Sequence, residues 1–448
     1  MKEVKIFSSL GNKLVTFEPI KPGKVSIYVC GPTVYNDPHI GNMRPVIVFD
    51  EWRRLFLALG YEVKYVSNYT DVDDKIIRRA KELGITEKEL TESVISEFRR
   101  LVSEVGALQP DETPKPTVYM PQIIKYIQEL IENGSAYVSG GDVYYRVSSD
   151  PSYGCLSGNT PESLQAGMRI EVNSQKESPL DFALWKKTDE GIKWHTEWSE
   201  GRPGWHTECC VMINSIFKEQ NGLIDIHGGG FDLKFPHHEN EIAQSESHNH
   251  NILANYWIHN GFINIDNEKM SKSLGNVVLA KDVISKWGGM PLRIMMLNTH
   301  YRAPLAFTND TIEEAVTNYK KITSLVKTLA VKLQLANVDL NNLKGEGEDK
   351  FFDELCNDLN TPNALTVLYG EMKLANQLLR TKEPDIQAIS ESFTKIKDYL
   401  NILGIVAPYP VLSEEDKNIF KEYFEAKNNK DFAKSDSIRG ILIEKNLL

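Results

Sequence analysis

The sequence of 448 residues has few cysteines and lacks a long uncharged apolar run. Its five cysteines, at positions 30, 155, 209, 210 and 356, form no CxxC pair, which argues against a disulfide scaffold and leaves metal binding or free thiols open. No apolar run approaches a membrane span, and the first twenty residues lack the apolar core and cleavage site of a secretory signal. We therefore expect a cytoplasmic protein with no membrane contact.

An excess of positive charge is also absent. The 51 Lys and Arg residues are outnumbered by 62 Asp and Glu residues, which gives a formal net charge of −11 at pH 7. Such a chain is not expected to coat nucleic acid non-specifically, although a local basic face could still contact a phosphate backbone. The hydrophobic content of 41% is typical of globular proteins, and the length allows two or three domains.

Strand and helix signals alternate in the first quarter of the chain. Residues 25–29 are β-branched and aromatic and lie between Pro-Gly and Gly-Pro pairs, so they predict a buried strand. Residues 46–59 predict an amphipathic helix, 62–66 a second strand and 73–83 a second helix. This alternation predicts a parallel sheet with helices on its faces.

The middle of the chain predicts an insertion followed by a return to the sheet. Residues 116–222 are mixed, with a helix at 122–133 and a hairpin at 137–145, and we interpret them as a segment that interrupts the sheet. Strand signals then return in three places, where we expect the sheet to resume. They lie at 223–227, 256–259 and 262–265.

The last third of the chain predicts an α-helical module. Apolar residues with three-and-four spacing form one stripe between 312 and 333. Further along, Thr361 is expected to cap a helix that has Pro362 at its first position. No internal repeat or low-complexity tract is visible.

The stretch from Cys30 to Asn42 carries the first chemical signal. Cys30 follows the predicted strand, and ligands bind outside the carboxyl ends of parallel strands. Asp37 is expected to cap a helix with Pro38 in its first turn, so that His39 and Asn42 share the face near the amino end, where phosphate binds readily. The alternative is a buried core cysteine followed by a capping histidine.

Two lysines in the pentapeptide KMSKS give a second phosphate signal. Lys269 and Lys272 lie three positions apart beside two serine hydroxyls, after an apolar strand and a turn. This pattern suits a polyphosphate whose charge grows as a bond breaks. A solvated surface loop is the alternative for the pentapeptide alone.

Two further segments, besides Cys30, carry a metal signal. If the segment after Pro236 is helical, His237 and Glu241 are one turn apart and can hold one zinc ion, whereas His238 is expected to point away by about 100°. Of the adjacent Cys209 and Cys210, at most one is expected to join, and both could instead be small core residues.

A glycine run follows another predicted strand. His227 is followed by Gly228, Gly229 and Gly230, which let a ligand lie against the backbone. A plain tight turn explains the run almost as well.

Taken together, these motifs resemble those of the cysteinyl-tRNA synthetases, a family of class I aminoacyl-tRNA synthetases. PHIGN stands where that family has its HIGH motif, and KMSKS matches the second signature in full. The resemblance spans roughly residues 4–300 and continues more loosely through the helical module. Its other motifs are CGPTVY, SNYTDVDDKII, GRPGWHTEC, DIHGGGFDLKFPHHENEIAQSE and EKMSKSLGN.

The resemblance implies three groups of site residues. One zinc ion per chain would be bound by Cys30, Cys209, His237 and Glu241. ATP, with Mg²⁺, would be bound at the catalytic residues His39, Asn42, Lys269 and Lys272. The cysteine and adenylate pocket would be lined by Thr33, Trp205, His206 and His227.

The resemblance also implies a fold and a domain order. We expect an α/β protein whose Rossmann-like, parallel-sheet catalytic domain is split by an insertion and followed by a C-terminal α-helical domain. Its parts would be the first catalytic half with PHIGN, the insertion with GWHTEC, the second catalytic half, the KMSKS and stem-contact region, and the helical tRNA and anticodon-binding region. Their bounds would be 1–115, 116–222, 223–265, 266–307 and 308–448.

The implied reaction joins L-cysteine to tRNA(Cys) in two steps. Cysteine and ATP would give cysteinyl-adenylate and pyrophosphate, and the terminal adenosine of the tRNA would then take the acyl group. Zinc binds a thiolate far better than a hydroxyl, so coordination could replace an editing domain, of which we see no sign. We expect a monomer, because the sequence shows no unexplained apolar stripe that a second chain would have to cover.

Two departures and two rivals accompany this interpretation. Asn42 replaces the last histidine of HIGH and cannot become cationic, so we expect modest activity, and the chain ends without the family's Trp-containing tail, which puts tRNA selectivity in doubt. A mycothiol-type ligase that joins cysteine to an amino sugar would not need the long helical region. A catalytically silent RNA-binding paralog would not need intact KMSKS and a complete ligand set.

Overall fold

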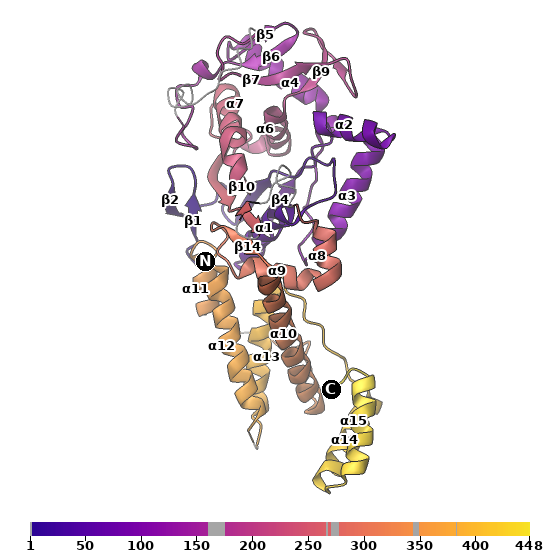
Figure 1. Ribbon diagram of the computed structural model, residues 1–448. Helices are drawn as coiled ribbons and strands as arrows, with labels where there is room; N and C mark the ends of the chain where they lie inside the picture. Colours follow the sequence, from indigo (N-terminus) through magenta and orange to yellow (C-terminus); the bar gives the residue numbers. More distant parts are fainter. Residues whose placement is uncertain (1, 160–174, 266–267, 270–276, 344–348, 382) are drawn as a thin grey trace.

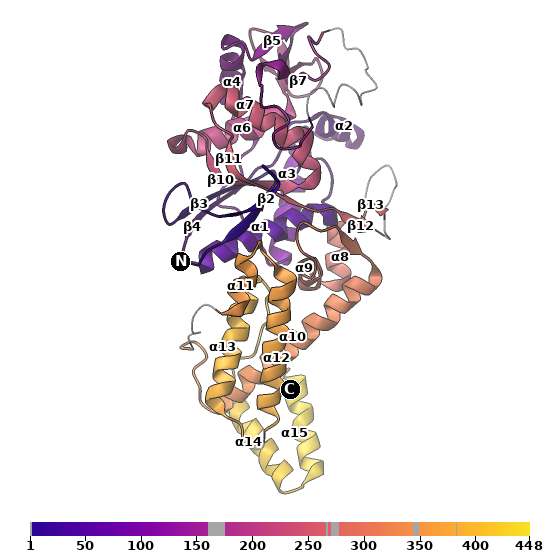
Figure 2. The same ribbon diagram turned by 90° about the vertical axis from the view of Figure 1, so that its left-hand side faces the viewer.

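The computed structural model describes residues 2–159, 175–265, 268–269, 277–343, 349–381 and 383–448. Figure 1 shows an elongated molecule in which the strands and their covering helices occupy one end and a group of long helices extends from the other. The view turned by 90° in Figure 2 shows the same two parts, with the amino terminus at their junction. Within the described ranges, no helix is long and apolar enough to cross a membrane.

The centre of the first part is a four-stranded parallel sheet in the order β11-β10-β3-β4. β3 is paired with β10 in the register Ile226↔Ile27 and Gly228↔Val29, although the two strands are far apart in the sequence. The predicted parallel sheet and its interruption are therefore confirmed. The strands are β3 (Lys24–Val29), β4 (Glu62–Ser67), β10 (Ile224–Gly230) and β11 (Ala254–Asn260), and a hairpin of β1 (Lys5–Ser8) and β2 (Lys13–Thr16) lies beside them.

Helix α1 (Ile40–Ala58) follows β3, but its cap differs from the predicted one. His39, not Asp37, is the N-cap residue: it is extended, with φ −93° and ψ 166°, and its backbone N–H donates to Asn42 Oδ1 at 3.0 Å. Pro38 O accepts from Ala280 N–H at 2.9 Å and Ile40 N–H donates to Val278 O at 3.0 Å, so this stretch pairs with residues 278–280 and the helix begins only after it. The Asp37 carboxylate instead accepts a hydrogen bond from Lys281 at 2.5 Å.

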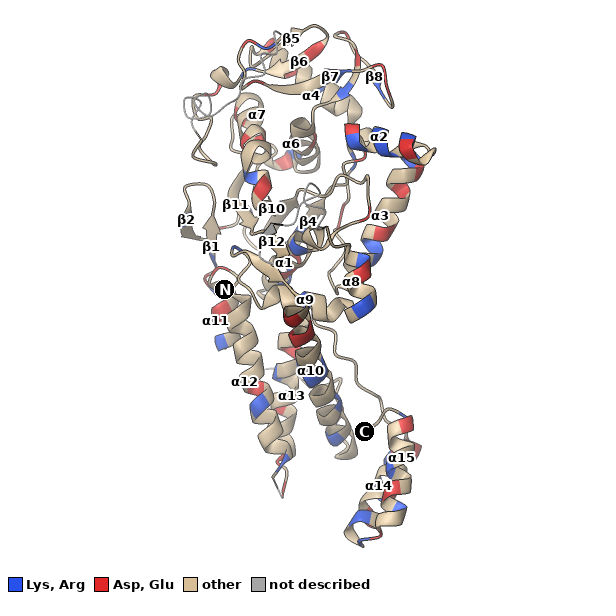
Figure 3. Cartoon of the chain, viewed as in Figure 1, with Lys and Arg blue, Asp and Glu red and all other residues tan. Residues whose placement is uncertain are grey.

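Helices α2 (Asp74–Leu83) and α3 (Glu87–Glu104) follow β4. The predicted helix at 73–83 is confirmed, with Asp73 as its cap. Figure 3 shows charges of both signs side by side on these helices, and several form surface ion pairs such as Arg79–Glu82 at 3.0 Å.

The insertion forms a second unit on top of the sheet (Figure 1). It contains α4 (Met120–Glu132) and a five-stranded antiparallel sheet in the order β5-β6-β7-β9-β8. The predicted hairpin at 137–145 is confirmed as β5 and β6. The strands are β5 (Ala136–Ser139), β6 (Asp142–Tyr145), β7 (Phe182–Lys187), β8 (Trp194–His195) and β9 (Glu200–Pro203).

Two helices connect the insertion to the sheet. α6 (Trp205–Ile216) precedes β10, and α7 (Glu239–Asn249) lies between β10 and β11. Tyr145 of β6 donates a hydrogen bond to the carbonyl oxygen of Ala243 in α7 at 2.9 Å. This contact ties the insertion to the helix that follows the glycine run.

The third expected strand of the returning sheet lies in a different sheet. β12 (Ile263–Ile265) pairs with β13 (Glu268–Lys269) and β14 (Leu305–Phe307), not with β11, so this expectation is wrong. Gly261 N–H donates to Tyr301 O at 2.8 Å, and a Cβ at Gly261 would lie 2.6 Å from Ala303 O. The chain therefore turns away at a glycine that packs against this segment. Helices α8 (Ala280–Trp287) and α9 (Gly289–Leu297) connect β13 to β14.

The helical module begins with α10, as the apolar stripe predicts. Its cap is Thr308, and Ile312, Ile322 and Leu329 are fully buried along one face. The expected cap of α12 is wrong by one position, because the Asn360 side chain accepts from the backbone of Asn363. The helices are α10 (Asn309–Leu335), α11 (Lys350–Cys356), α12 (Thr361–Leu379), α13 (Ile386–Ile402), α14 (Glu414–Asn428) and α15 (Phe432–Glu444).

A buried arginine joins the two parts of the molecule. Arg293 of α9 is fully buried and pairs with Asp50 at 2.5 Å and with Glu51, both on α1. Its remaining N–H groups donate to Leu403 O at 2.6 Å, just after α13, and to Val105 O at 3.1 Å, just after α3. The guanidinium of Arg293 thus links α9 to α1, to the end of α3 and to the end of α13. Of these, α13 belongs to the helical module and α1 to the part that contains the sheet.

Candidate metal and nucleotide site

Four predicted ligands converge at the carboxyl end of β3. Cys30 Sγ lies 3.6 Å from Cys209 Sγ and 3.8 Å from Glu241 Oε1. His237 Nε2 lies 3.9 Å from Cys209 Sγ and 3.1 Å from Glu241 Oε1. Three of the four residues are buried, and all four ligand atoms lie within 4.8 Å of one another. The structure therefore brings together Cys30, Cys209, His237 and Glu241.

Local structure explains this convergence. Cys30 directly follows β3, while Cys209 lies one turn into α6. His237 lies in the turn just before α7 and Glu241 in its first turn, four residues further on, and the two side chains meet at 3.1 Å. Parallel pairing of β3 with β10 places the first cysteine beside the segment that leads into α7.

The adjacent cysteine does not join this group. Cys210 Sγ contacts backbone carbonyl oxygens, at 3.7 Å from His206 O and 3.6 Å from Glu241 O. Of the two adjacent cysteines, only Cys209 therefore has its sulfur within this group.

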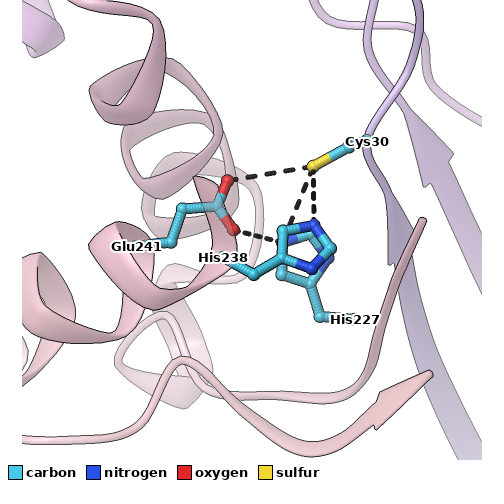
Figure 4. A group of neighbouring side chains, drawn as sticks. All are labelled: Cys30, His227, His238 and Glu241. Atoms are coloured by element: carbon cyan, nitrogen blue, oxygen red, sulfur yellow. Dashed lines mark hydrogen bonds and ion pairs between the residues drawn. The ribbon is translucent and has the colours of Figure 1, made fainter. Parts of the chain in front are cut away.

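His238 differs from its prediction. Its Nε2 lies 3.4 Å from Cys30 Sγ, although an ideal α-helix would point it away. Residues 234–238 form a wider π-type turn before α7 and include a non-helical residue at Phe235, so the ideal α repeat does not hold there. His227 approaches from β10, with Nε2 2.7 Å from Glu241 Oε2 (Figure 4). The predicted direction of the His238 side chain is therefore wrong.

The electrostatics of the cluster favour a bound cation. A hydrogen bond from Cys30 lowers the pKa of Cys209 to about 7, although burial opposes this. Burial disfavours the charged imidazole of His237, but Glu241 and Cys209 outweigh it and raise its pKa to about 10. Several proton-binding groups thus compete in one buried volume. A divalent ion can replace the protons that they would otherwise have to share.

The donor set fits zinc. Two sulfurs, one imidazole nitrogen and one carboxylate oxygen belong to the accepted ligands of this ion. Tetrahedral bonds of about 2.0–2.3 Å place neighbouring ligand atoms roughly 3.3–3.8 Å apart. Four of the six separations between the ligand atoms of Cys30, Cys209, His237 and Glu241 are 3.1–3.9 Å, near that range, and all six are within 4.8 Å.

A cleft of about 420 Å³ opens beside the cluster. Its lining includes Cys30, Thr33, His39, Asn42 and Trp205, so it joins the candidate metal ligands to the start of α1. The amino end of a helix favours phosphate. The cleft therefore has room for a molecule that reaches from the cluster to the nucleotide signature.

The remaining predicted pocket residues lie at different depths. Trp205 is 39% exposed and stacks on His237, with ring centroids 4.2 Å apart. His206 lies behind this ligand, with Nδ1 3.0 Å from His237 Nδ1. His227 is fully buried beneath the cluster. Neither His206 nor His227 lines the cleft directly.

The two lysines of KMSKS are described only in part. Lys269 belongs to β13, which pairs with β12 near the cleft wall at Ile263. Lys272 lies outside the described residues.

Comparisons with known proteins agree with this geometry. The model of the class I (C) tRNA synthetase catalytic domain matches residues 16–317, and the DALR domain model matches residues 350–407. The chain is 45% identical to the cysteine–tRNA ligase of Lysinibacillus sphaericus, over 98% of this chain and 97% of the relative. The chain belongs to the cysteine–tRNA ligase family.

Other members of the cysteine–tRNA ligase family are similar at comparable levels. The enzyme of Acholeplasma laidlawii is 43% identical, over 99% of this chain and 100% of the relative, and that of Brevibacillus brevis is 42% identical, over 99% and 97%. Among solved structures, Mycobacterium tuberculosis methionyl-tRNA synthetase with methionyl-adenylate has a TM-score of 0.63 at 14% identity, over 92% of this chain and 96% of that chain. The last likeness supports the fold.

Replacing Gly31 by alanine is expected to disturb the metal ligands. A Cβ at Gly31 would lie 1.6 Å from the backbone oxygen of Asn68, which cannot move away as a flexible side chain can. The adjacent Cys30 would have to shift. We expect Gly31→Ala to lower the metal content of the purified protein at least about tenfold, as lost support of a ligand does.

The matched control is Gly370→Ala in α12, where a Cβ would meet nothing within 4 Å. That change should leave the metal content unchanged and stabilise the exposed helix by about 0.5–1 kcal/mol. Equal metal content in both variants, measured by elemental analysis, would contradict the role given to Gly31.

Proposed function

We propose that this chain activates L-cysteine with ATP and transfers it to the 3′-terminal adenosine of tRNA(Cys). The observation that carries the proposal is the convergence of Cys30, Cys209, His237 and Glu241 at one end of a cleft that also reaches His39. Family membership supplies the reaction class. The cleft supplies neighbouring places for a thiol and for a nucleotide.

The four converging residues would hold one zinc ion. When bound, this borderline-soft ion would supply selective affinity for the sulfur of cysteine over the oxygen of serine. A hydrophobic pocket alone discriminates near-isosteric substrates by only about 1–3 kcal/mol. Trp205 covers the open side of His237, and His206 supports that ligand from behind.

The residues of the two signatures would bind ATP. His39 and Asn42 at the start of α1 would contact the phosphates, with Thr33 on the cleft wall, and Lys269 and Lys272 would neutralise charge that develops on them. Mg²⁺ would accompany the nucleotide. No side chain need act as a covalent nucleophile, so positioning and charge stabilisation supply the catalysis.

Different regions of the chain would contact different parts of the tRNA. The region 266–307 would contact the acceptor stem, and the helices of 308–448 would bind the tRNA. We propose that the protein acts as a monomer in the cytoplasm. The domain bounds given from the sequence remain a proposal about these roles.

Two assays test the proposed function. Pyrophosphate exchange that requires both cysteine and ATP is expected, and it would be absent from a silent paralog. Charging of tRNA(Cys) with cysteine is expected next, whereas a mycothiol-type ligase would use an amino sugar instead. Exchange without charging, in the presence of an amino-sugar product, would overturn the proposal.

Asn42→Ala is expected to slow adenylate formation. Asn42 Oδ1 accepts the His39 N–H at 3.0 Å and the residue lines the cleft, so its Nδ2 is the side-chain group that would donate to phosphate. A hydrogen bond to a charged group is worth about 1.5–3 kcal/mol, so we expect at least about a tenfold lower kcat/KM for ATP. Asn42→His is the conservative control and should keep the wild-type rate or exceed it. An unchanged rate in Asn42→Ala would show that the amide contributes nothing.

A further inference from the structure

Two of the candidate metal ligands, Cys30 and Glu241, also belong to a second set of possible ligands. Cys30 Sγ lies 3.4 Å from His238 Nε2 and 3.9 Å from His227 Nε2. Glu241 Oε2 lies 2.7 Å from His227 Nε2. The four ligand atoms lie within 4.8 Å of one another, and Figure 4 shows the side chains turned toward a common point. The second set is Cys30, His227, His238 and Glu241.

Both additional histidines are oriented as metal ligands usually are. His227 Nδ1 lies 2.9 Å from Tyr28 O, which can only accept, so Nδ1 donates there and Nε2 is the ring nitrogen left to share a proton or a metal ion with Glu241. His238 Nδ1 lies 2.8 Å from His259 Nε2, and His259 Nδ1 lies 2.7 Å from Ser9 Oγ. Such partners on the far nitrogen fix the tautomer and ring orientation of ligating histidines.

Glu241 is placed between the two sets. Its Oε1 lies 3.1 Å from His237 Nε2 in the first set, and its Oε2 lies 2.7 Å from His227 Nε2 in the second. An imidazole lone pair and a carboxylate oxygen at this separation repel each other unless a proton or a metal cation lies between them. Each oxygen of the carboxylate thus faces a different histidine, across a contact that a proton fills when no metal ion is bound.

Burial excludes an ordinary surface role for these histidines. His227 and His238 are fully buried, and His259 is 5% exposed. Buried polar groups are expected to have partners, and the Nε2 atoms of His227 and His238 both face the one sulfur of Cys30.

We propose that the cluster offers one zinc-like divalent ion two positions that share Cys30 and Glu241. The first position is completed by Cys209 and His237, and the second by His227 and His238. This rests on the metal role proposed above for the shared residues. A sulfur, two imidazole nitrogens and a carboxylate oxygen form a zinc ligand set of their own. Loss of Cys209 therefore transfers the ion to the second position instead of releasing it.

The test measures metal binding by the full-length protein. Wild type, Cys209→Ser, His238→Ala and the double variant are dialysed against buffered zinc and analysed for metal, with Cys155→Ser as the matched cysteine control. Wild type, His238→Ala and the control should hold about one ion per chain. Cys209→Ser should hold the ion about tenfold to a hundredfold more weakly, and adding His238→Ala should remove it.

Cobalt in place of zinc reports the ligands directly. The thiolate-to-cobalt absorption of Cys209→Ser should fall to about half of the wild-type intensity, because one sulfur remains in place of two. His237→Ala, which removes the other ligand private to the first position, provides a second route if Cys209→Ser does not fold. The His237→Ala variant should also bind an ion, and the double variant His237→Ala with His238→Ala should not.

The outcomes separate the two proposals. A metal-free wild type would overturn the proposed zinc function itself. If the wild type holds metal but the folded Cys209→Ser and His237→Ala variants do not, the second position alone is overturned. Retention in Cys209→Ser that is unaffected by His238→Ala would also overturn it, because the ion would then be held by other groups.

Discussion

Cys30→Ser is expected to remove the metal ion and to stop cysteine activation. Cys30 is the only sulfur common to both ligand sets, and its Sγ lies 3.6 Å from Cys209 Sγ and 3.4 Å from His238 Nε2. A serine hydroxyl is a poor zinc ligand, so neither position keeps its soft donor. Since loss of outer-shell support alone costs about 10–100-fold in affinity or activity, we expect a decrease of at least about a hundredfold in both.

Elemental analysis and cysteine-dependent pyrophosphate exchange measure the two effects in the same preparation. Cys155→Ser is the control, because this exposed thiol contacts Glu239 Oε1 at 3.7 Å and belongs to neither ligand set. It should leave both quantities unchanged. A Cys30→Ser protein that exchanges pyrophosphate at the wild-type rate would show that this sulfur does not take part in cysteine activation.

Arg293→Ala is expected to cause the largest loss of stability. The guanidinium is fully buried between Asp50 and Glu51, whose side chains are 2% and 1% exposed. Removing it leaves two carboxylates without their main partner in a buried site and frees the carbonyl oxygens of Val105 and Leu403. Breaking a buried ion pair from one side costs about 3–5 kcal/mol, and we expect a loss of that size.

Urea unfolding followed by circular dichroism measures this loss. Arg79→Ala is the matched control, since Arg79 forms a surface pair with Glu82 at 3.0 Å, with side chains 38% and 53% exposed. An exposed pair of this kind contributes about 0–1 kcal/mol. If the two variants lost the same stability, the buried arginine would not be the link between the sheet and the helical module that its contacts indicate.

The sequence pattern predicted an element correctly where the structure of that element depends on residues close together in the sequence. The strand at β3 and the helix α10 were predicted because their periodicity depends only on neighbouring residues. The cap of α1 was misplaced because residues 38–40 pair with the distant residues 278–280, a contact that local capping preferences do not contain. β12 was assigned to the wrong sheet because strand pairing is decided between distant segments.

The candidate site shows the same limit. His237 and Glu241 were expected to meet because they are four residues apart, whereas His238 was expected to point away because the π-type turn before α7, which breaks the assumed repeat, was not foreseen. The choice between Cys209 and Cys210 needed the direction of α6 relative to β3, which residue spacing does not contain. The burial of Arg293 could not be predicted from the sequence, since arginine side chains are usually exposed and its partners come from three other elements.

The central claim is that the metal held by Cys30, Cys209, His237 and Glu241 binds the thiol of the substrate. A crystal structure of the zinc-loaded protein with cysteine tests it most directly. Of the protein ligands, Glu241 is expected to have the longest bond, because one of four must loosen or the coordination must expand to admit the sulfur. We predict a distance of about 2.3 Å between that sulfur and the metal, and a distance of more than about 3 Å would contradict the account.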